Sequence, residues 1–283
     1  MKLLKLHMLR RIFAERETFA GIALVSPIVI FALFANFIAP YNPLIYASAP
    51  PLEPPSVGHI MGTDQTGGDI FSQVVYGSRV ALYVALCSVA LSLVIAVAAG
   101  LTSGYFGGIA GEAIMRIADL VLSIPSFVLI ILVVVLFGSR LNNIVLIIAL
   151  VSWPALARII RAEVLSLKER EFVLAAKAIG AGQIDIMVNE ILPNVWFKLM
   201  PAVTLQAGLA VVIEAGISFL GLGDPNTSSW GRTLMFAYQS VYSGAWWGIV
   251  FPTIAIVMTV MGFNLVGEGI SKSLSPKLAT HQK

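Results

Sequence analysis

Charged residues are scarce in this chain. Of its 283 residues only 12% are Asp, Glu, Lys or Arg, whereas 58% are hydrophobic, and the mean hydropathy is +0.90. Soluble globular domains carry roughly 25% charged and about 45–50% apolar residues. A chain with so few charges cannot cover its own surface with polar groups in water. The composition therefore excludes a soluble globular fold and predicts a membrane protein.

Cysteine and histidine are also sparse. The single cysteine, Cys87, excludes a disulfide framework, and the three histidines (His7, His59 and His281) lack any metal-ligand spacing, so we expect no metal site. The sequence contains no GxxxxGK[ST] phosphate-binding loop, which argues against ATP hydrolysis by this chain and leaves no expected cofactor. It offers no convergent catalytic set for a membrane enzyme, and no basic face on a soluble module for nucleic acid.

Long runs without charge are what the sequence has in abundance. Crossing the hydrocarbon core of a bilayer takes about 20 residues of helix, and six segments of this kind are present. We therefore predict an all-α polytopic membrane protein with six transmembrane helices, at 19–38, 80–101, 120–137, 143–160, 201–220 and 247–266.

The distribution of Lys and Arg predicts the orientation of these helices. With the amino terminus inside, fifteen of the eighteen basic residues fall on the cytoplasmic side, and only Arg79, Arg140 and Arg232 fall outside. Cytoplasmic loops of membrane proteins carry such an excess of basic residues. We therefore expect a multi-pass protein of the cell membrane with both termini in the cytoplasm.

A proline-rich stretch divides the chain into two parts. Residues 40–78 hold six prolines and then several glycines, so we expect this external segment to be extended and irregular. Residues 1–60 would form a cytoplasmic tail, a first membrane anchor and the start of the loop, and residues 61–283 a five-helix core. The alternative, a cleaved signal peptide ending near 47–49, is disfavoured because the apolar stretch of about 20 residues exceeds an ordinary h-region.

The longest hydrophilic stretch, about 162–198, lies on the predicted cytoplasmic side. It reads as a short helix over 170–179, a break at 180–182 and a second short helix over 183–192, followed by Pro193. Glycine permits a tight turn between the two helices, and the paired alanines Ala175 and Ala176 allow close approach of another surface. A docking role is favoured over the alternative of a solvated loop.

This loop carries a motif that resembles a known family. Residues 171–180 and 191–194 resemble the "EAA…G…LP" signature of the permease subunits of ABC importers. Further segments are similar to the dipeptide/oligopeptide/nickel branch, and most to its second, C-type permease: 62–69, 76–79, 104–108, 115–116, 119, 124–125, 153–154, 214, 218–223, 229–231 and 263–265. The resemblance covers about residues 15–278. Departures occur at Leu174, where the signature has glutamate, and at Gly68 and Gln73, where the branch commonly has arginine.

The resemblance implies a type I ABC importer permease fold and a transport role without covalent chemistry. The chain would form half of a solute pathway together with a second homologous permease, two cytoplasmic ATPases that hydrolyse ATP, an external solute-binding protein and membrane lipid. Peptides, nickel chelates and oligosaccharides are the solutes of this branch. The residues implied to couple the permease to the ATPases are Glu171, Ala175, Ala176, Gly180, Leu192 and Pro193.

Three acidic residues lie in or near the predicted helices. Asp119 is three residues from Arg116, which predicts a local ion pair, and Glu268 is expected to be solvated just after the last helix. Glu214 has no basic neighbour within one turn, so Glu214 and Ser218 are candidates either for the pathway or for a permease interface. The alternative function is an ion-coupled secondary carrier that uses Asp119 and Glu214.

Aromatic residues gather before the last helix, and prolines interrupt two others. Trp230, Tyr238, Tyr242, Trp246 and Trp247 are expected to form an interfacial belt. The prolines at 125 and 154 are expected to bend the third and fourth helices.

Overall fold

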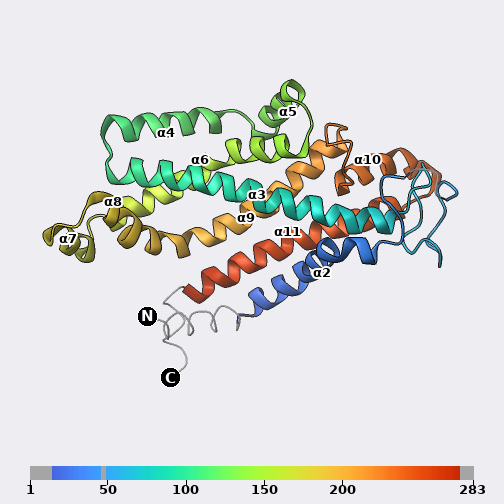
Figure 1. Cartoon of the computed structure of the whole chain (residues 1–283), viewed down its shortest axis with the longest axis horizontal. Helices are drawn as coiled ribbons and strands as arrows, with labels where there is room; N and C mark the ends of the chain where they lie inside the picture. The colour runs from blue at the N-terminus through green and yellow to red at the C-terminus, as the bar shows by residue number, and fades with distance from the viewer. Residues whose placement is uncertain (1–14, 46–48, 275–283) are drawn as a thin grey trace.

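The computed structural model describes residues 15–45 and 49–274, and within these residues its regular secondary structure is helical, with one isolated bridge between Thr63 and Asp69. Figure 1 shows an elongated bundle whose long helices run side by side. The helices are α2 (Arg16–Ile38), α3 (Ile70–Tyr105), α4 (Gly108–Ser123), α5 (Ser126–Phe137), α6 (Leu141–Leu167), α7 (Glu171–Ala178), α8 (Gln183–Asp185), the π-helix Ile186–Ile191, α9 (Leu192–Phe219), α10 (Trp230–Ser240), the 3-10 turn Val241–Ser243 and α11 (Trp247–Leu274).

Five of these helices are long and apolar enough to cross a membrane: α2, α3, α6, the Lys198–Phe219 part of α9, and α11. The sixth expected span falls on a pair of helices that are separated by a sharp bend. Helices α4 and α5 meet at an angle of 88°, so the prediction of a single helix over 120–137 is wrong. The break lies at Ile124, which is extended, and Pro125, which is not helical, because proline lacks an N–H and disfavours helix in the residue before it.

Two further helix boundaries differ from expectation. Helix α3 begins at Ile70, so the predicted irregular segment ends earlier than residue 78; the Asp69 side chain accepts a hydrogen bond from the Ser72 N–H and caps the helix. The predicted second short helix does not end at Pro193. This proline sits in the first turn of α9, where a missing N–H removes no intrahelical bond, and the chain therefore stays helical from Gln183 to Phe219.

Helix α3 lies at the centre of the bundle, against α6, α9 and α2, while α11 packs between α9 and α2. The two ends of the bundle differ, and we name them for what they carry. The loop end holds the segments 39–45, 49–69, 220–229 and 241–246; the α7 end holds α7, α8, the last turns of α3 and α6 and the start of α4 (Figure 1).

Candidate functional site

Helix α7 projects from one end of the bundle, between α6 and the long run that begins with α8 (Figure 1). One residue of the helix, Val173, is fully buried, in the same core cluster as Val164 and Ile186. Most of the remaining helix is exposed, including the apolar side chains of Phe172 and Leu174. Helix α7 is thus anchored by one side chain and presents its other faces outward.

The turn after α7 depends on one glycine. Gly180 has φ +84°, its N–H donates to the Lys177 carbonyl, and the Ala181 N–H donates to the Ala176 carbonyl, both at 3.0 Å. This pair of bonds is the Schellman arrangement, which requires a left-handed residue where glycine avoids the Cβ penalty. The sequence-based expectation of a break at this glycine is therefore confirmed, and its positive φ supplies the reason.

The six predicted coupling residues fall into two groups. Glu171 and Ala175 are exposed on α7, Ala176 is half-buried against the core, and Gly180 ends the helix. Leu192 packs against the same core cluster, and Pro193 is exposed in the first turn of α9. The motif therefore spans the projection and the base of the helix that leads away from it.

Glu214 and Ser218 lie together inside α9. The Glu214 side chain is buried, with the residue 3% exposed, and the Ser218 hydroxyl donates to its Oε1 at 2.6 Å. A second hydrogen-bond partner is Ser229, the N-cap residue of α10. In this arrangement the carboxylate joins α9 to the start of α10 within the subunit.

The other two acidic residues have tertiary partners that local spacing did not indicate. Asp119 pairs with Arg158 of α6 and not with Arg116 of its own helix, because α4 packs alongside α6. Glu268 is not merely solvated: Lys272 contacts it at 2.9 Å and reaches Glu17 of α2 at 2.6 Å. This three-residue cluster ties the first described helix to the last.

Two of the five belt aromatics have a structural role instead. Trp230 and Trp247 are buried, and their indole N–H groups donate to the carbonyls of Val74 and Thr63, at 2.9 and 3.0 Å. Both residues fasten the loop end to α3 and its preceding loop. The interpretation as an interfacial belt is wrong for these two, whereas Tyr238, Tyr242 and Trp246 are exposed.

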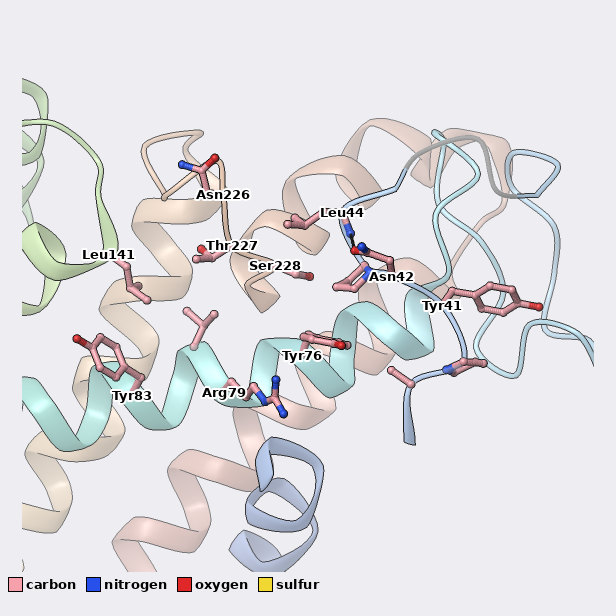
Figure 2. A pocket seen from close by; sticks show the side chains of 14 residues that line it. Tyr41, Asn42, Leu44, Tyr76, Arg79, Tyr83, Leu141, Asn226, Thr227 and Ser228 are labelled. Carbon is pink, nitrogen blue, oxygen red and sulfur yellow. Dashed lines mark hydrogen bonds between the residues drawn. The ribbon is translucent and has the colours of Figure 1, made fainter. Parts of the chain in front are cut away.

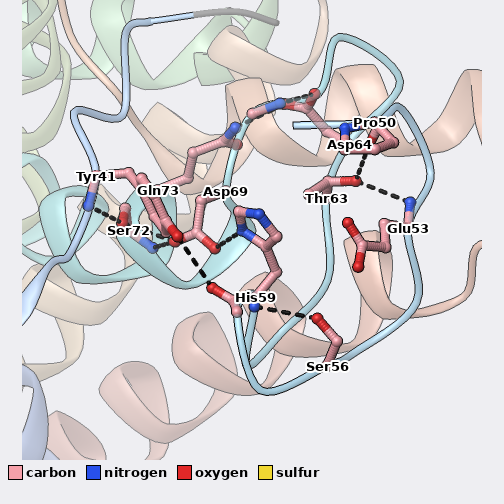
Figure 3. A network of polar contacts seen from close by, with 12 residues as sticks. Tyr41, Pro50, Glu53, Ser56, His59, Thr63, Asp64, Asp69, Ser72 and Gln73 are labelled. Atoms are coloured by element: carbon pink, nitrogen blue, oxygen red, sulfur yellow. Dashed lines mark hydrogen bonds and ion pairs between the residues drawn. The ribbon is translucent and has the colours of Figure 1, made fainter. Parts of the chain in front are cut away.

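Sequence reasoning missed a buried polar network in the loop before α3 (Figure 3). Asp69 accepts from the Ser72 hydroxyl at 2.7 Å and contacts His59 Nδ1 at 2.9 Å. Asp64 accepts from the Gly68 N–H at 2.9 Å and from the Gln73 amide at 2.6 Å. The signal that could have indicated this network is a pair of aspartates close together in the sequence, with Thr, Gly and Ser residues around them.

A cavity of about 720 Å³ opens beside this network, at the loop end. In Figure 2 Asn42 and Leu44 face it from one side, Thr227 and Ser228 from another, and Leu141 from a third. The Arg79 guanidinium turns away toward α2, where Nε donates to the Ala32 carbonyl at 2.7 Å. Amides and hydroxyls therefore supply most of the hydrogen-bonding groups of this cavity.

The part of the chain that the structure describes contains no group of three His, Cys, Asp or Glu side chains placed to hold a metal ion. Its geometry contains instead a projecting helix, a buried carboxylate and a rigid loop end.

Comparison with known proteins identifies the family. Residues 92–280 match the family described as "Binding-protein-dependent transport system inner membrane component". Among curated relatives, the di/tripeptide transport system permease protein DppC of Pseudomonas aeruginosa is 36% identical over 93% of this chain and 89% of the relative. The oligopeptide transport system permease protein OppC of Bacillus subtilis is 34% identical over 95% and 88%, and the glutathione transport system permease protein GsiD of Pectobacterium atrosepticum 34% over 95% and 90%.

A solved structure supports the fold. A chain of the MetNI methionine ABC transporter, in an inward-facing conformation, superposes with a TM-score of 0.55 over 71% of this chain and 94% of that chain, at 20% identity. The chain therefore belongs to the family of binding-protein-dependent transport system inner membrane components: it is the membrane permease of an ABC importer and not itself an enzyme, and ATP hydrolysis falls to a separate subunit.

Proposed function

We propose that this permease imports short peptides. The support is the solute for which its relatives are named: di- and tripeptides, oligopeptides or glutathione. The resemblance also extends to carriers of oligosaccharides and nickel chelates, and transport assays on the cognate binding protein would separate these solutes. The chain would work with a second homologous permease, two cytoplasmic ATPases and an external solute-binding protein.

A secondary carrier does not fit the geometry. The two acidic residues that such a carrier would use do not share a site. Asp119 is half-exposed in an ion pair with Arg158, whereas Glu214 is buried against α10. For Glu214 and Ser218 we propose a role at the pathway or the permease interface.

We propose further that the α7 end is cytoplasmic and that both termini lie on that side. The excess of Lys and Arg in the segments at that end supports this orientation. In a chain with Cys87 replaced by Ala, a cysteine at the fully exposed Tyr242 should react with an impermeant reagent in intact cells, and one at Ile179, 87% exposed, only after permeabilisation. Labelling of position 179 in intact cells would reverse the orientation.

The observation that carries the coupling role is the geometry of α7. A short helix with exposed Phe172 and Leu174, closed by a Schellman turn, suits a groove on an ATPase. Because α7 is joined on one side to α6 and on the other to the continuous run into α9, a displacement of the docked helix must tilt both spans. Closure of the ATPases on ATP would thereby open or close the pathway.

Two neighbouring glycines allow a matched test. Gly180 has φ +84° with open space around it, whereas Gly182 has φ −68° and is the N-cap of α8. Gly180→Asp should strain the turn by about 1–2 kcal/mol and misplace α7, so that the chain inserts but the ATPases dissociate or hydrolyse ATP without uptake. Gly182→Asp adds the same charge at a position that favours Asp, and should leave coupling intact.

The measurements are co-purification of the ATPases and peptide uptake per ATP hydrolysed in proteoliposomes. Equal coupling in the wild-type, Gly180→Asp and Gly182→Asp complexes would show that α7 is only a solvated loop.

A further inference from the structure

A cleft of about 470 Å³ lies at the α7 end, on the side of α7 that faces the bundle. It is bounded by the last residue of α3, the C-cap of α6, the last turn of α7 and the start of α8. The residues that line it are Tyr105, Phe106, Lys168, Lys177, Ala181, Gln183 and Ile186. The cleft is therefore a meeting point of two membrane spans and the proposed coupling helix.

Two lysines converge on this cleft without a carboxylate partner. Lys177 Nζ stands 5.5 Å from the centre of the Tyr105 ring, and Lys168 is half-buried at the end of α6. In the described part of the chain neither forms an ion pair, although Lys198 nearby contacts Glu163 at 2.6 Å. Two like charges beside one cavity repel each other, and an anion between them would remove that cost.

Two apolar side chains at and near the cleft are exposed. Phe106, which lines the cleft, is 53% exposed, and Ile109, three residues further along the chain in the first turn of α4, is 90% exposed. Tyr105 lies only four residues, roughly 6 Å of helix, beyond Leu101 at the end of the apolar stretch. The polar zone of a bilayer leaflet is about 5–7 Å deep, so we infer from this spacing that Tyr105 and its neighbours lie at the level of the lipid headgroups.

From these observations we propose that the cleft binds the phosphate group of an anionic phospholipid of the cytoplasmic leaflet. Lys168 and Lys177 neutralise the phosphate, the Gln183 amide supplies a neutral donor, and Phe106 and Ile109 contact the glycerol and upper acyl region. The inference rests on the proposed orientation, because the cytoplasmic leaflet is the one rich in anionic lipid and basic pockets there suit anionic headgroups. The bound lipid would bridge the end of α3 to α7.

The test uses the complete importer, with its partner subunits, in nanodiscs of phosphatidylcholine with a minor fraction of phosphatidylglycerol. Native mass spectrometry measures retention of phosphatidylglycerol by the complex as its fraction is varied. Lys168→Gln and Lys177→Gln should each weaken retention about five-fold, which corresponds to about 1 kcal/mol per basic residue. Lys168→Arg should retain the lipid, since the charge is kept.

The matched control is Lys198→Gln. It removes one positive charge from the same end, but from an ammonium already paired with Glu163, and should leave retention unchanged. Equal retention in Lys168→Gln, Lys177→Gln and wild type would overturn the proposal. Displacement of the lipid by millimolar inorganic phosphate would overturn it in favour of a site for soluble phosphate.

A third contrary outcome concerns the ATPases. If Lys168→Gln releases the ATPase subunits while lipid retention stays at the wild-type level, the cleft belongs to a protein interface and the lipid proposal fails. Peptide uptake is measured separately on the wild-type complex. A complex that retains phosphatidylglycerol but imports no peptide would refute the proposed function and leave the lipid site standing.

Discussion

The loop end and the α7 end of this permease hold their segments in place by different means. At the loop end, buried hydrogen bonds and close packing join α3, α9 and α10: Trp230 donates to the Val74 carbonyl, and Gly231 lies so close to Ala215 that a Cβ there would overlap its carbonyl oxygen. At the α7 end, Val173 is the buried anchor of α7, and nothing lies within 4 Å of a Cβ built at Gly180 or Gly182.

This difference indicates where the bundle can yield. An end fastened by buried polar groups resists local opening, because separating them leaves donors and acceptors unsatisfied. Helix α7, whose side chains are mostly exposed and which has one fully buried anchor, can move at lower cost. We infer that force applied at α7 would tilt α6 and α9 about the loop end as a fixed point.

The largest expected effect comes from breaking the close approach of α10 to α9. Gly231→Val places a branched side chain against the backbone of Ala215, which cannot move aside, and should cost at least about 3 kcal/mol, at or beyond the usual range for overpacking. Gly208→Ala is the control, because its Cβ would meet Val260 at an ordinary 3.4 Å. Thermal unfolding in detergent measures both. A stable Gly231→Val variant would mean that the loop end is not rigid.

A smaller loss is expected from the loop network. Asp69→Ala removes the cap of α3 and the acceptor shared by Ser72 and His59, and should destabilise the chain by about 2–3 kcal/mol. Asp69→Asn keeps one acceptor oxygen and should cost less than half as much. The midpoint of thermal unfolding is the readout, and equal midpoints for both variants would assign the network no role in stability.

Substitutions of Glu214 test the junction between α9 and α10. Glu214→Ala leaves the hydroxyls of Ser218 and Ser229 without their buried acceptor, so about 2 kcal/mol of stability should be lost. Glu214→Gln retains an acceptor and should preserve folding and assembly, while uptake falls if the residue also serves the pathway. Unfolding and uptake are measured on the same preparations. A Gln variant with unchanged uptake would restrict Glu214 to a structural role.

The smallest effect is expected near the α7 end. Asp119 and Arg158 are both about half-exposed, and exposed ion pairs contribute below about 1 kcal/mol. A double-mutant cycle with Asp119→Asn and Arg158→Gln should give a coupling energy in that range. A coupling above about 2 kcal/mol would show that this end is also fastened, and would remove the contrast between the two ends.

Much of this architecture is predictable from the sequence, for local reasons. Apolar composition alone locates the five unbroken spans, and the glycine at 180 indicates a turn because a Schellman motif needs a left-handed residue. The predicted kink at Pro125 is present. Its angle of 88° is not predictable, because it depends on how α5 packs against α6.

Tertiary partners explain the remaining errors. Spacing along one helix suggested Arg116 for Asp119, whereas the true partner, Arg158, is 39 residues away. The first turns of α3 belong to the segment that is expected from the sequence to be irregular. They are helical because the network around Asp69 caps and buries them. Trp230 and Trp247 fit an interfacial pattern, and only the carbonyls they bond reveal that they face inward.

The pairing of Gly77 with Trp230 has a consequence for how this chain can change over time. A Cβ at position 77 would overlap the Trp230 indole. A larger residue fits at position 77 only after Trp230 has been replaced by a smaller residue. Shrinking the tryptophan first leaves the Val74 carbonyl without its indole donor and opens a void beside α3. Whichever of the two substitutions comes first, the single variant is less stable than the original pair. Drift at these two sites is therefore expected to be slow and, when it occurs, to be correlated between them.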